Sequence, residues 1–331
     1  MHLYCTLFDR NYLARGLALH GSLLRHCRQF RLVVLCLDET THEILTTLSP
    51  PNMELVSLSS LEESDPELSR TRPQRTAVEY YFTCKPALLK FMARKYTDAQ
   101  RMTYLDSDLF YFSDPGPLEL EYAGSAVALT PHRFPPRLAE LDNRGRFNAG
   151  WISVSCGEEG RRFIDWWRAR CIEWCRWEVL EDRYGDQKYL DRVPMLFSDV
   201  TILDHVGANL APWNLDGLDI RRTEDGVVVE GKPLVFFHFH GLRRVLYRIY
   251  ESGLAFYDLN LSPQVRRNIY RPYFSDLALA ESRLSRLPAD VRGSLAADRG
   301  TPGLRQLLRR IRQVLHVVKS GNALVLVRRW P

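Results

Sequence analysis

The sequence predicts an α/β fold: a doubly wound mixed sheet, followed by a helical C-terminal extension. Three observations predict it. Strand and helix patterns alternate through the first third of the chain, which is typical of a right-handed, mostly parallel sheet. Residues 31–37 form a continuous apolar run, as buried parallel strands do. After about residue 260 the alternation stops and helical patterns dominate, so we predict two units, residues 1–260 and 261–331.

The individual elements follow from local periodicity. Residues 2–8 read as a strand, and residues 11–26 as a helix whose leucines recur at mostly helical spacing. The other predicted strands are 31–37, 53–57, 101–105, 125–130, 147–155 and 234–240. The other predicted helices are 41–48, 79–95, 158–184 and a short one within 182–190, and a Pro- and Arg-rich surface loop spans 131–146.

The long helix predicted at 158–184 carries four tryptophans at three- and four-residue spacings: Trp166, Trp167, Trp174 and Trp177. Such spacings favour a face packed in the core over a platform that stacks on sugars.

Composition narrows the class of protein. With 331 residues, 45% of them hydrophobic, the chain can bury a sizeable core. A net charge of +5 fits an anionic ligand or membrane surface better than nucleic acid, so we expect no nucleic-acid partner. No segment is long and apolar enough to span a bilayer, and the start does not resemble a signal peptide. Seven cysteines without a C-x-x-C pattern favour a reducing cytoplasm.

Two carboxylates, Asp106 and Asp108, follow the predicted strand at residues 101–105 and precede an apolar run at 109–112. Carboxylates at the carboxyl end of a strand can converge on one divalent ion, and ligands bind at this edge of open α/β sheets. A single Asp-x-Asp more often marks a turn with a solvated side chain. Carboxylates inside so apolar a stretch, however, need a compensating cation or hydrogen-bond donors, which favours a metal site.

A second group of polar residues stands at the end of the last predicted strand. His238 and His240 stand two residues apart, so on a regular strand both face the same side. A histidine on an apolar strand is more often a core residue, yet Gly241, Arg243 and Arg244 follow directly here. An imidazole can complete a site that two carboxylates begin, and the cations suit a diphosphate.

The turn after the first strand carries Asp9, Asn11 and Tyr12. A carboxylate and an aromatic ring at such a turn can bind a nucleobase by hydrogen bonding and stacking. The alternative is that Asp9 or Asn11 caps the following helix. Neither a G-x-G-x-x-G fingerprint nor a G-x-x-x-x-G-K-[ST] loop occurs, so dinucleotide and P-loop sites are poorly supported.

Taken together, these residues resemble the GT-A nucleotide-sugar glycosyltransferases, most closely glycosyltransferase family 8, the retaining group of glycogenin-like and bacterial lipooligosaccharide galactosyltransferases. The likeness runs from the N-terminus to about residue 250 and rests on four ordered motifs: Tyr104-Leu105-Asp106-Ser107-Asp108, Phe147-Asn148-Ala149-Gly150, Asp186-Gln187 and His238-Phe239-His240-Gly241. It implies a GT-A fold and a Mn²⁺ or Mg²⁺ ion. It also implies retaining transfer of a sugar from a nucleoside-diphosphate sugar to a glycan or lipid-linked acceptor, as in bacterial surface polysaccharide synthesis.

The resemblance also implies roles for single residues. Asp106, Asp108 and His238 would bind the ion. Asn148, Asp186 and Gln187 would orient the sugar and face its anomeric carbon, with Asp186 acting either as a nucleophile or as a positioning group. The implied substrate-binding residues are Asp9, Asn11, Tyr12, Lys85, Ser107, Ala149, Gly150, His240, Gly241 and Arg244. Trp213 would lie on the acceptor side, either stacking on a sugar or packing in the core.

Two positions depart from the family pattern. Lys188 stands where the family has the third residue of Asp-Gln-Asp, and Arg244-Val245-Leu246 replaces Lys-Pro-Trp. Two other functions stay open. A sugar-nucleotide nucleotidyltransferase would carry a Gly-rich basic loop after the first strand, which residues 9–16 lack. A non-catalytic sugar-nucleotide-binding scaffold would bind a donor without turning it over.

The tail has a distinct charge pattern. Residues 301–331 contain seven Lys or Arg and no Asp or Glu, with apolar residues at helical spacing from Leu304 to Val318. Such a basic amphipathic helix either lies on an anionic membrane surface or docks on the main domain or a partner subunit. We therefore expect a cytoplasmic protein with a peripheral membrane contact, if any, through this tail.

Overall fold

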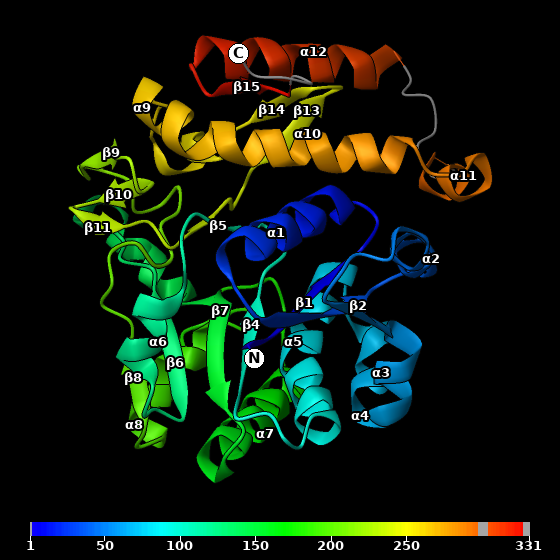
Figure 1. Cartoon of the computed structure of the whole chain (residues 1–331), viewed down its shortest axis with the longest axis vertical. Helices are drawn as coiled ribbons and strands as arrows, with labels where there is room; N and C mark the ends of the chain where they lie inside the picture. Colours follow the sequence, from blue (N-terminus) through cyan, green and yellow to red (C-terminus); the bar gives the residue numbers. More distant parts are fainter. Residues whose placement is uncertain (1, 297–303, 327–331) are drawn as a thin grey trace.

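A seven-stranded sheet lies at the centre of the computed structural model, which describes residues 2–296 and 304–326 (Figure 1). Its strand order is β3-β2-β1-β4-β7-β6-β8. The first four strands in this order are parallel, and β7 runs antiparallel to both β4 and β6. The strands are β1 (His2–Phe8), β2 (Phe30–Cys36), β3 (Met53–Ser57), β4 (Arg101–Leu105), β6 (Val127–Pro131), β7 (Phe147–Ser155) and β8 (Val200–Ile202). The predicted α/β mixed sheet is confirmed.

Helices cover both faces of this sheet. Because side chains alternate along a strand, Val33 and Leu35 of β2 belong to one core cluster, whereas Leu32 and Val34 belong to the other. The first cluster packs against α5 (Ala77–Lys95) and α7 (Glu158–Glu173), and the second against α1 (Leu13–His26) and α2 (Glu39–Leu48). Shorter helices are α3 (Leu58–Ser64), α4 (Pro66–Thr71), α6 (Gly116–Tyr122) and α8 (Val193–Leu196).

The helix predicted at 158–184 is shorter than expected. It ends at Glu173, because Trp174 turns to extended backbone with φ −155° and ψ 130°. Of the four tryptophans, Trp167 is buried, and Trp166 and Trp174 pack against the same core cluster. Trp177 is 58% exposed and stacks on Phe82 at 5.5 Å, so the core interpretation is wrong for this residue. The three- to four-residue spacing continued past the point where the helix stops.

The C-terminal extension is helical but includes one strand that its pattern did not predict. The helices are α9 (Pro263–Val265), α10 (Arg271–Ser285), α11 (Ala289–Ala296) and α12 (Leu304–Lys319). The strand β15 (Ala323–Val325) pairs with β14 (Ile249–Glu251), which pairs with β13 (Arg243–Leu246). α10 packs on α1, and this small sheet and α12 form the layers beyond it (Figure 1).

The structure contains two further small sheets. β5 (Leu109–Tyr111) pairs antiparallel with β12 (Phe236–His238). β9 (Ile220–Arg222), β10 (Val227–Val229) and β11 (Lys232–Pro233) form a three-stranded meander. Among the described residues, none of the helices combines the length and the apolar character needed to cross a bilayer.

All seven cysteines are buried and free. Burial raises the pKa of Cys27 and Cys36 to about 12. These thiols therefore contribute packing volume and stay protonated at neutral pH.

Candidate functional site

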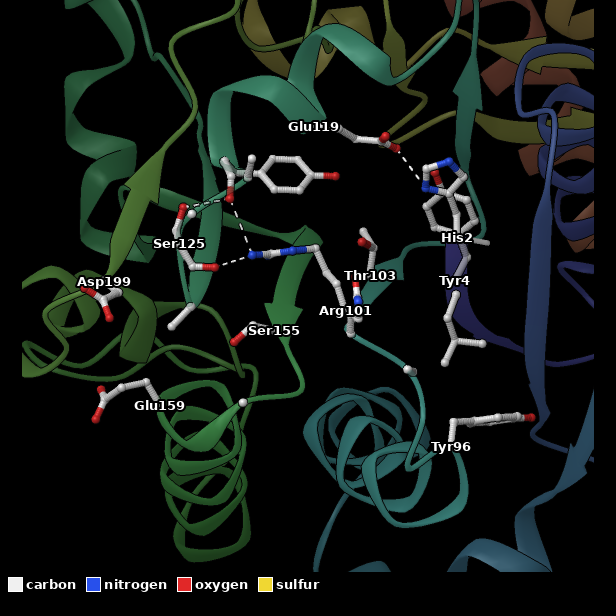
Figure 2. Close-up of a pocket in the computed structure, with 18 of the residues that line it drawn as sticks. His2, Tyr4, Tyr96, Arg101, Thr103, Glu119, Ser125, Ser155, Glu159 and Asp199 are labelled. Atoms are coloured by element: carbon white, nitrogen blue, oxygen red, sulfur yellow. Dashed lines mark hydrogen bonds and ion pairs between the residues drawn. The ribbon is translucent and has the colours of Figure 1, made fainter.

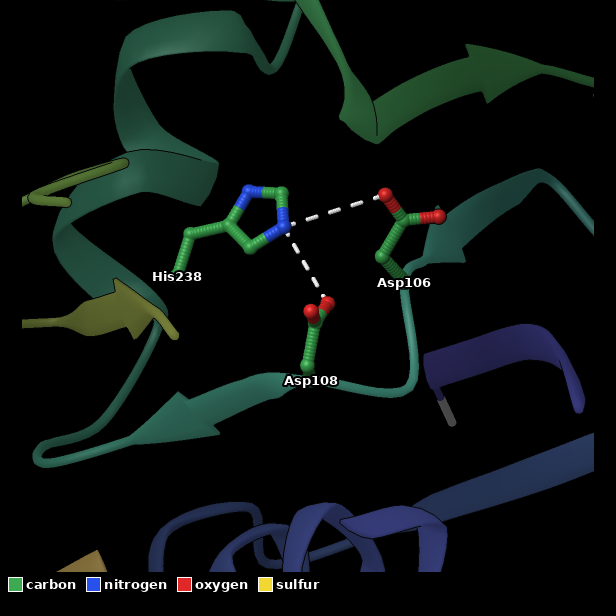
Figure 3. Close-up of side chains that lie close together, drawn as sticks. All are labelled: Asp106, Asp108 and His238. Atoms are coloured by element: carbon green, nitrogen blue, oxygen red, sulfur yellow. Dashed lines mark ion pairs between the residues drawn. The ribbon is translucent and has the colours of Figure 1, made fainter. Parts of the chain in front are cut away.

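Three potential metal ligands converge at the carboxyl edge of the sheet, where Asp106, Asp108 and His238 each place one ligand atom within 4.8 Å of the other two (Figure 3). His238 Nε2 lies 3.1 Å from Asp108 Oδ1 and 3.9 Å from Asp106 Oδ2. His238 and Asp108 are 2% and 9% exposed. One imidazole nitrogen and two carboxylates are a ligand set that fits a divalent ion.

A turn and a strand pairing bring these side chains together. β4 ends at Leu105, and the amide of Leu109 donates to Asp106 O at 3.1 Å, which folds residues 106–108 into a turn. β5 then pairs with β12, and this register places His238 opposite Leu109. The amide of Phe239 also donates to Asp108 O at 2.9 Å. The carboxylates therefore converge through a turn, and His238 reaches them from a distant strand.

Asn148 orients the imidazole of His238. Asn148 Oδ1 accepts from the amide of Gly150 at 3.0 Å, so it must also accept from His238 Nδ1, 3.2 Å away. Nδ1 therefore carries a proton, and Nε2 faces the two carboxylates, where a metal ion would bind it. The amide nitrogen of Asn148 donates to His132 Nε2 at 3.2 Å and to Gln187 Oε1 at 3.4 Å. Burial, with His238 and His240 alongside, lowers the pKa of His132 to about 3, so His132 stays neutral and accepts this bond.

Gly150 allows the ligands to approach so closely. A Cβ atom at this position would lie 2.6 Å from Asn148 Oδ1, 2.7 Å from His238 Cε1 and 2.9 Å from Asp106 Oδ2. These contacts are shorter than van der Waals separation, so only glycine fits beside the three side chains.

Gly150→Ala should therefore displace the site while the fold survives. We expect a loss of about 10²-fold in turnover, because shifts below 1 Å misalign reacting groups, and a cost of about 1–3 kcal/mol in stability. The control is Gly124→Ala, where a Cβ meets no atom within 4 Å. Steady-state kinetics and urea denaturation measure both effects, and equal kinetics for the two variants would contradict the crowding argument.

A buried lysine joins Asp106 to Asp186. Lys85 Nζ lies 3.0 Å from Asp106 Oδ1 and 3.2 Å from Asp186 Oδ2, and donates to Ala149 O at 3.4 Å. Burial opposes the charge on Lys85, but the two carboxylates outweigh it and raise its pKa. Burial raises the pKa of Asp186, against the attraction of Lys85. Tyr104 completes the group, since its hydroxyl donates to Asp106 Oδ1 at 2.8 Å.

Gln187 connects the site to the 3₁₀ helix Pro136–Arg144, which lies within the stretch predicted as a surface loop. Its Oε1 accepts from the amide of Ala149 at 3.3 Å, and its Nε2 donates to Arg144 O at 3.0 Å. The residues Asn148, Ala149, Gly150, Asp186 and Gln187, predicted from two separate motifs, thus form one connected network with the predicted metal ligands.

The predicted base-binding turn is connected to Asp108, one of the predicted metal ligands, through Arg15. Asp9 accepts from the backbone and side-chain amides of Asn11, both at 3.0 Å, and neither residue caps α1. The half-exposed ring of Tyr12 lies 4.3 Å from the Arg15 guanidinium, which approaches Asp108 Oδ2 at 3.9 Å. Burial raises the pKa of Asp108, but His238 and Arg15 outweigh it, so the net shift is downward.

Trp213 packs against His238 and His240. Its ring lies 5.3 Å from His238 and 5.5 Å from His240, and it is only 2% exposed. The indole therefore packs in this structure and leaves no open face for a sugar. His240 is exposed beyond the end of β12, and Gly241, with φ +72°, turns the chain after it.

The last two predicted residues differ in their surroundings. Ser107 is buried in the turn between the two carboxylates. Arg244 lies on β13, where it donates to Tyr250 Oη and pairs with Glu281 of α10. Its charge is thus balanced by a carboxylate outside the metal site.

Sequence reasoning missed Arg15 and His132. Both act through contacts between elements far apart in the chain, and neither lies in a motif. The only local signal is that Arg15 follows Tyr12 by three residues on a helix, a spacing that places side chains together.

A separate depression of about 1000 Å³ lies at the opposite edge of the sheet, near the amino ends of β1 and β4 (Figure 2). Some of its polar groups contact one another: His2 pairs with Glu119 at 2.9 Å, and Arg101 donates to Ser125 O and Ser153 Oγ. Because ligands of open α/β sheets bind at the carboxyl edge, we place the functional site at the Asp106–Asp108–His238 cluster.

Sequence comparison identifies two relatives of this chain. The chain is 34% identical over 277 residues to the uncharacterized protein YfnD of Bacillus subtilis, covering 83% of this chain and 88% of YfnD. It is also 34% identical over 251 residues to the uncharacterized protein YfnF of the same organism, covering 82% of YfnF. No protein-family model matches the chain.

Solved structures extend the comparison. The galactosyltransferase LgtC, in complex with donor and acceptor sugar analogues, superposes with a TM-score of 0.55 at 17% identity, covering 88% of this chain and 99% of LgtC. An active-site mutant of LgtC gives the same TM-score at 15% identity. Its relatives and its architecture together place this chain in one family with YfnD and YfnF, built on the GT-A fold of LgtC.

Proposed function

We propose that the protein is a metal-dependent retaining glycosyltransferase, which transfers a sugar from a nucleoside-diphosphate sugar to a hydroxyl of a glycan or lipid-linked acceptor in glycan synthesis. The observation that carries this proposal is the convergence of Asp106, Asp108 and His238 at the carboxyl edge of a GT-A sheet. The fold shared with LgtC, whose structure holds donor and acceptor sugar analogues, supports it. Retention is proposed on the ordered motifs that resemble family 8.

The donor set fits Mn²⁺ or Mg²⁺. His238 directs Nε2 toward the two carboxylates, and its other nitrogen is held by Asn148, so little reorganisation is needed to bind an ion. When bound, a divalent ion would stabilise the negative charge that develops on the leaving nucleoside diphosphate.

The charges of the site suit such an ion. Asp106, Asp108 and Asp186 carry three negative charges, and their buried partners Lys85 and Arg15 carry two positive ones. One negative charge is left over, and a divalent cation would turn this excess into a net positive charge. A diphosphate would then be attracted to the site.

Asp186 and Gln187 would act on the sugar side. Outside its ion pair with Lys85, Asp186 Oδ2 makes no hydrogen bond although it is buried. We assign it as the acceptor of a sugar hydroxyl, positioned by Lys85. Tyr12, which leaves part of its ring exposed next to Arg15, would stack on the nucleobase.

The first test is thermal denaturation with a panel of nucleoside diphosphates and their sugars, each with Mn²⁺, Mg²⁺ or a chelator. We expect one nucleotide to raise Tm only when metal is present, because a ligand of the native state stabilises it. Turnover of the matching sugar donor should then release the nucleoside diphosphate, and NMR of the product reports the anomeric configuration. Release of pyrophosphate from a nucleoside triphosphate, or binding without turnover, would contradict the proposal.

Asn148→Ala tests the orienting role of this amide. The variant frees the His238 ring, so we expect metal affinity to fall about 10–100-fold, as for other residues that hold a ligand in place. Mn²⁺ titration by calorimetry measures it. Asn260→Ala, at an exposed position, is the control and should bind Mn²⁺ like the wild type.

A further inference from the structure

The outermost helix, α12, exposes a stripe of apolar side chains. Ile311, Leu315 and Val318 are 41%, 55% and 56% exposed. Their spacing of four and three residues aligns them along one face of the helix. Val325 of the adjoining strand β15 is 46% exposed as well. A group of exposed apolar side chains of this kind marks a site of contact with a membrane or with another protein.

The helix docks on the protein by its flank. Val317 is 2% exposed, and Gln313 and Val314 are half-buried where α12 packs against β13 and β15. Val317 lies about 120° around the helix from Ile311. An amphipathic helix ordinarily covers its apolar face by docking, but the exposures of Ile311, Leu315 and Val318 show that this stripe is uncovered. The helix itself lies in the outer layer of the molecule (Figure 1).

The surroundings of the stripe are cationic. Arg312, His316 and Lys319 are exposed beside it. Residues 301–331 contain seven Lys or Arg and no acidic residue. The neighbouring β13–β14 turn adds Tyr247, 77% exposed, with the Arg248 guanidinium 5.3 Å from its ring. An apolar stripe with cations beside it and an exposed aromatic ring nearby is the arrangement found in helices that lie in a membrane interface.

We infer that α12 lies on an anionic lipid bilayer, with Ile311, Leu315 and Val318 at the acyl boundary and Arg312 and Lys319 at the headgroup phosphates. A second copy of the chain is the competing occupant. Two identical tails, each with seven cations and no acid, would repel each other, whereas an anionic surface attracts them. Charge complementarity therefore selects the bilayer, and this inference is independent of the transferase proposal.

The test is flotation of the full chain with phosphatidylcholine vesicles, with and without phosphatidylglycerol. We expect binding to the anionic vesicles that weakens with salt. The triple variant I311S/L315S/V318S should lower the partition coefficient about 10–100-fold, and R312Q/K319Q about tenfold. The control L120S/M195S removes side chains that are 84% and 78% exposed elsewhere, and it should bind like the wild type.

Two results would overturn the inference. One is no binding of the wild type to anionic vesicles, or equal binding of the triple and control variants. The other is self-association of the wild type by light scattering, lost in the triple variant, while neither binds vesicles. That result would assign the stripe to a second copy. All variants change exposed positions, and unchanged Tm values confirm that they fold.

Discussion

Asp108→Asn should abolish sugar transfer while the protein stays folded. The substitution keeps the shape of the side chain and its place beside His238 Nε2, but removes the charge that a divalent ion needs. We expect a loss of at least about 10³-fold in turnover, equivalent to several kcal/mol of charge stabilisation. The measurement is donor turnover at saturating Mn²⁺, together with Mn²⁺ titration.

The matched control for this variant is Asp225→Asn, at an exposed position between β9 and β10. It makes the same chemical change away from the site and should leave turnover and metal affinity as they are. Unchanged melting of both variants separates a lost ligand from a lost fold. Turnover by Asp108→Asn at the wild-type rate would remove Asp108 from the proposed metal site.

Lys85→Met should be the most destabilising substitution in the site. It leaves the carboxylates of Asp106 and Asp186 facing each other without the ammonium that now lies 3.0 and 3.2 Å from them. Removing one partner of a buried ion pair costs about 3–5 kcal/mol, because the remaining charge is left uncompensated. Urea denaturation of the metal-free protein measures the loss.

Lys90→Met on the same helix provides the comparison. Lys90 pairs with Asp165 at 2.6 Å, but the Asp165 side chain is 59% exposed, so we expect a cost of at most about 1 kcal/mol. If the two variants were equally stable, the Lys85 bridge would carry no more energy than a surface pair. Its proposed role in holding Asp186 would then fail.

The strands that the sequence predicted best are those whose ends are marked by turn residues or charges, whereas the continuous apolar run predicted at 31–37 is shifted by one residue from β2 (Phe30–Cys36). The bounds of β1, β3 and β7 agree with the predicted strands to the residue, because each run is bounded by turn residues or charges. β15 was missed because three residues are too few to display a period. The end of α7 was missed because the three- and four-residue spacing of the tryptophans continues to Trp177, past the last helical residue, Glu173.

The sequence likewise predicted some residues of the site and missed contacts between others. Asp106 and Asp108 were predicted as metal ligands because they follow a strand end, where ligands bind, whereas the choice of His238 over His240 came from the resemblance to family 8. The bridge from Lys85 to Asp186 could not be predicted, since it depends on how α5 packs beside the loop after α7. The approach of Arg15 to Asp108 likewise results from the docking of α1.

The pairing of β5 with β12 also sets an order of events during synthesis. The two carboxylates and the strands that flank them lie within the first 155 residues, whereas His238 is added more than eighty residues later. A nascent chain that has folded only its first half therefore contains both carboxylates but lacks His238, the third predicted ligand. Binding of the proposed ion would therefore be a late step in the maturation of this protein, after synthesis of the strand that carries His238.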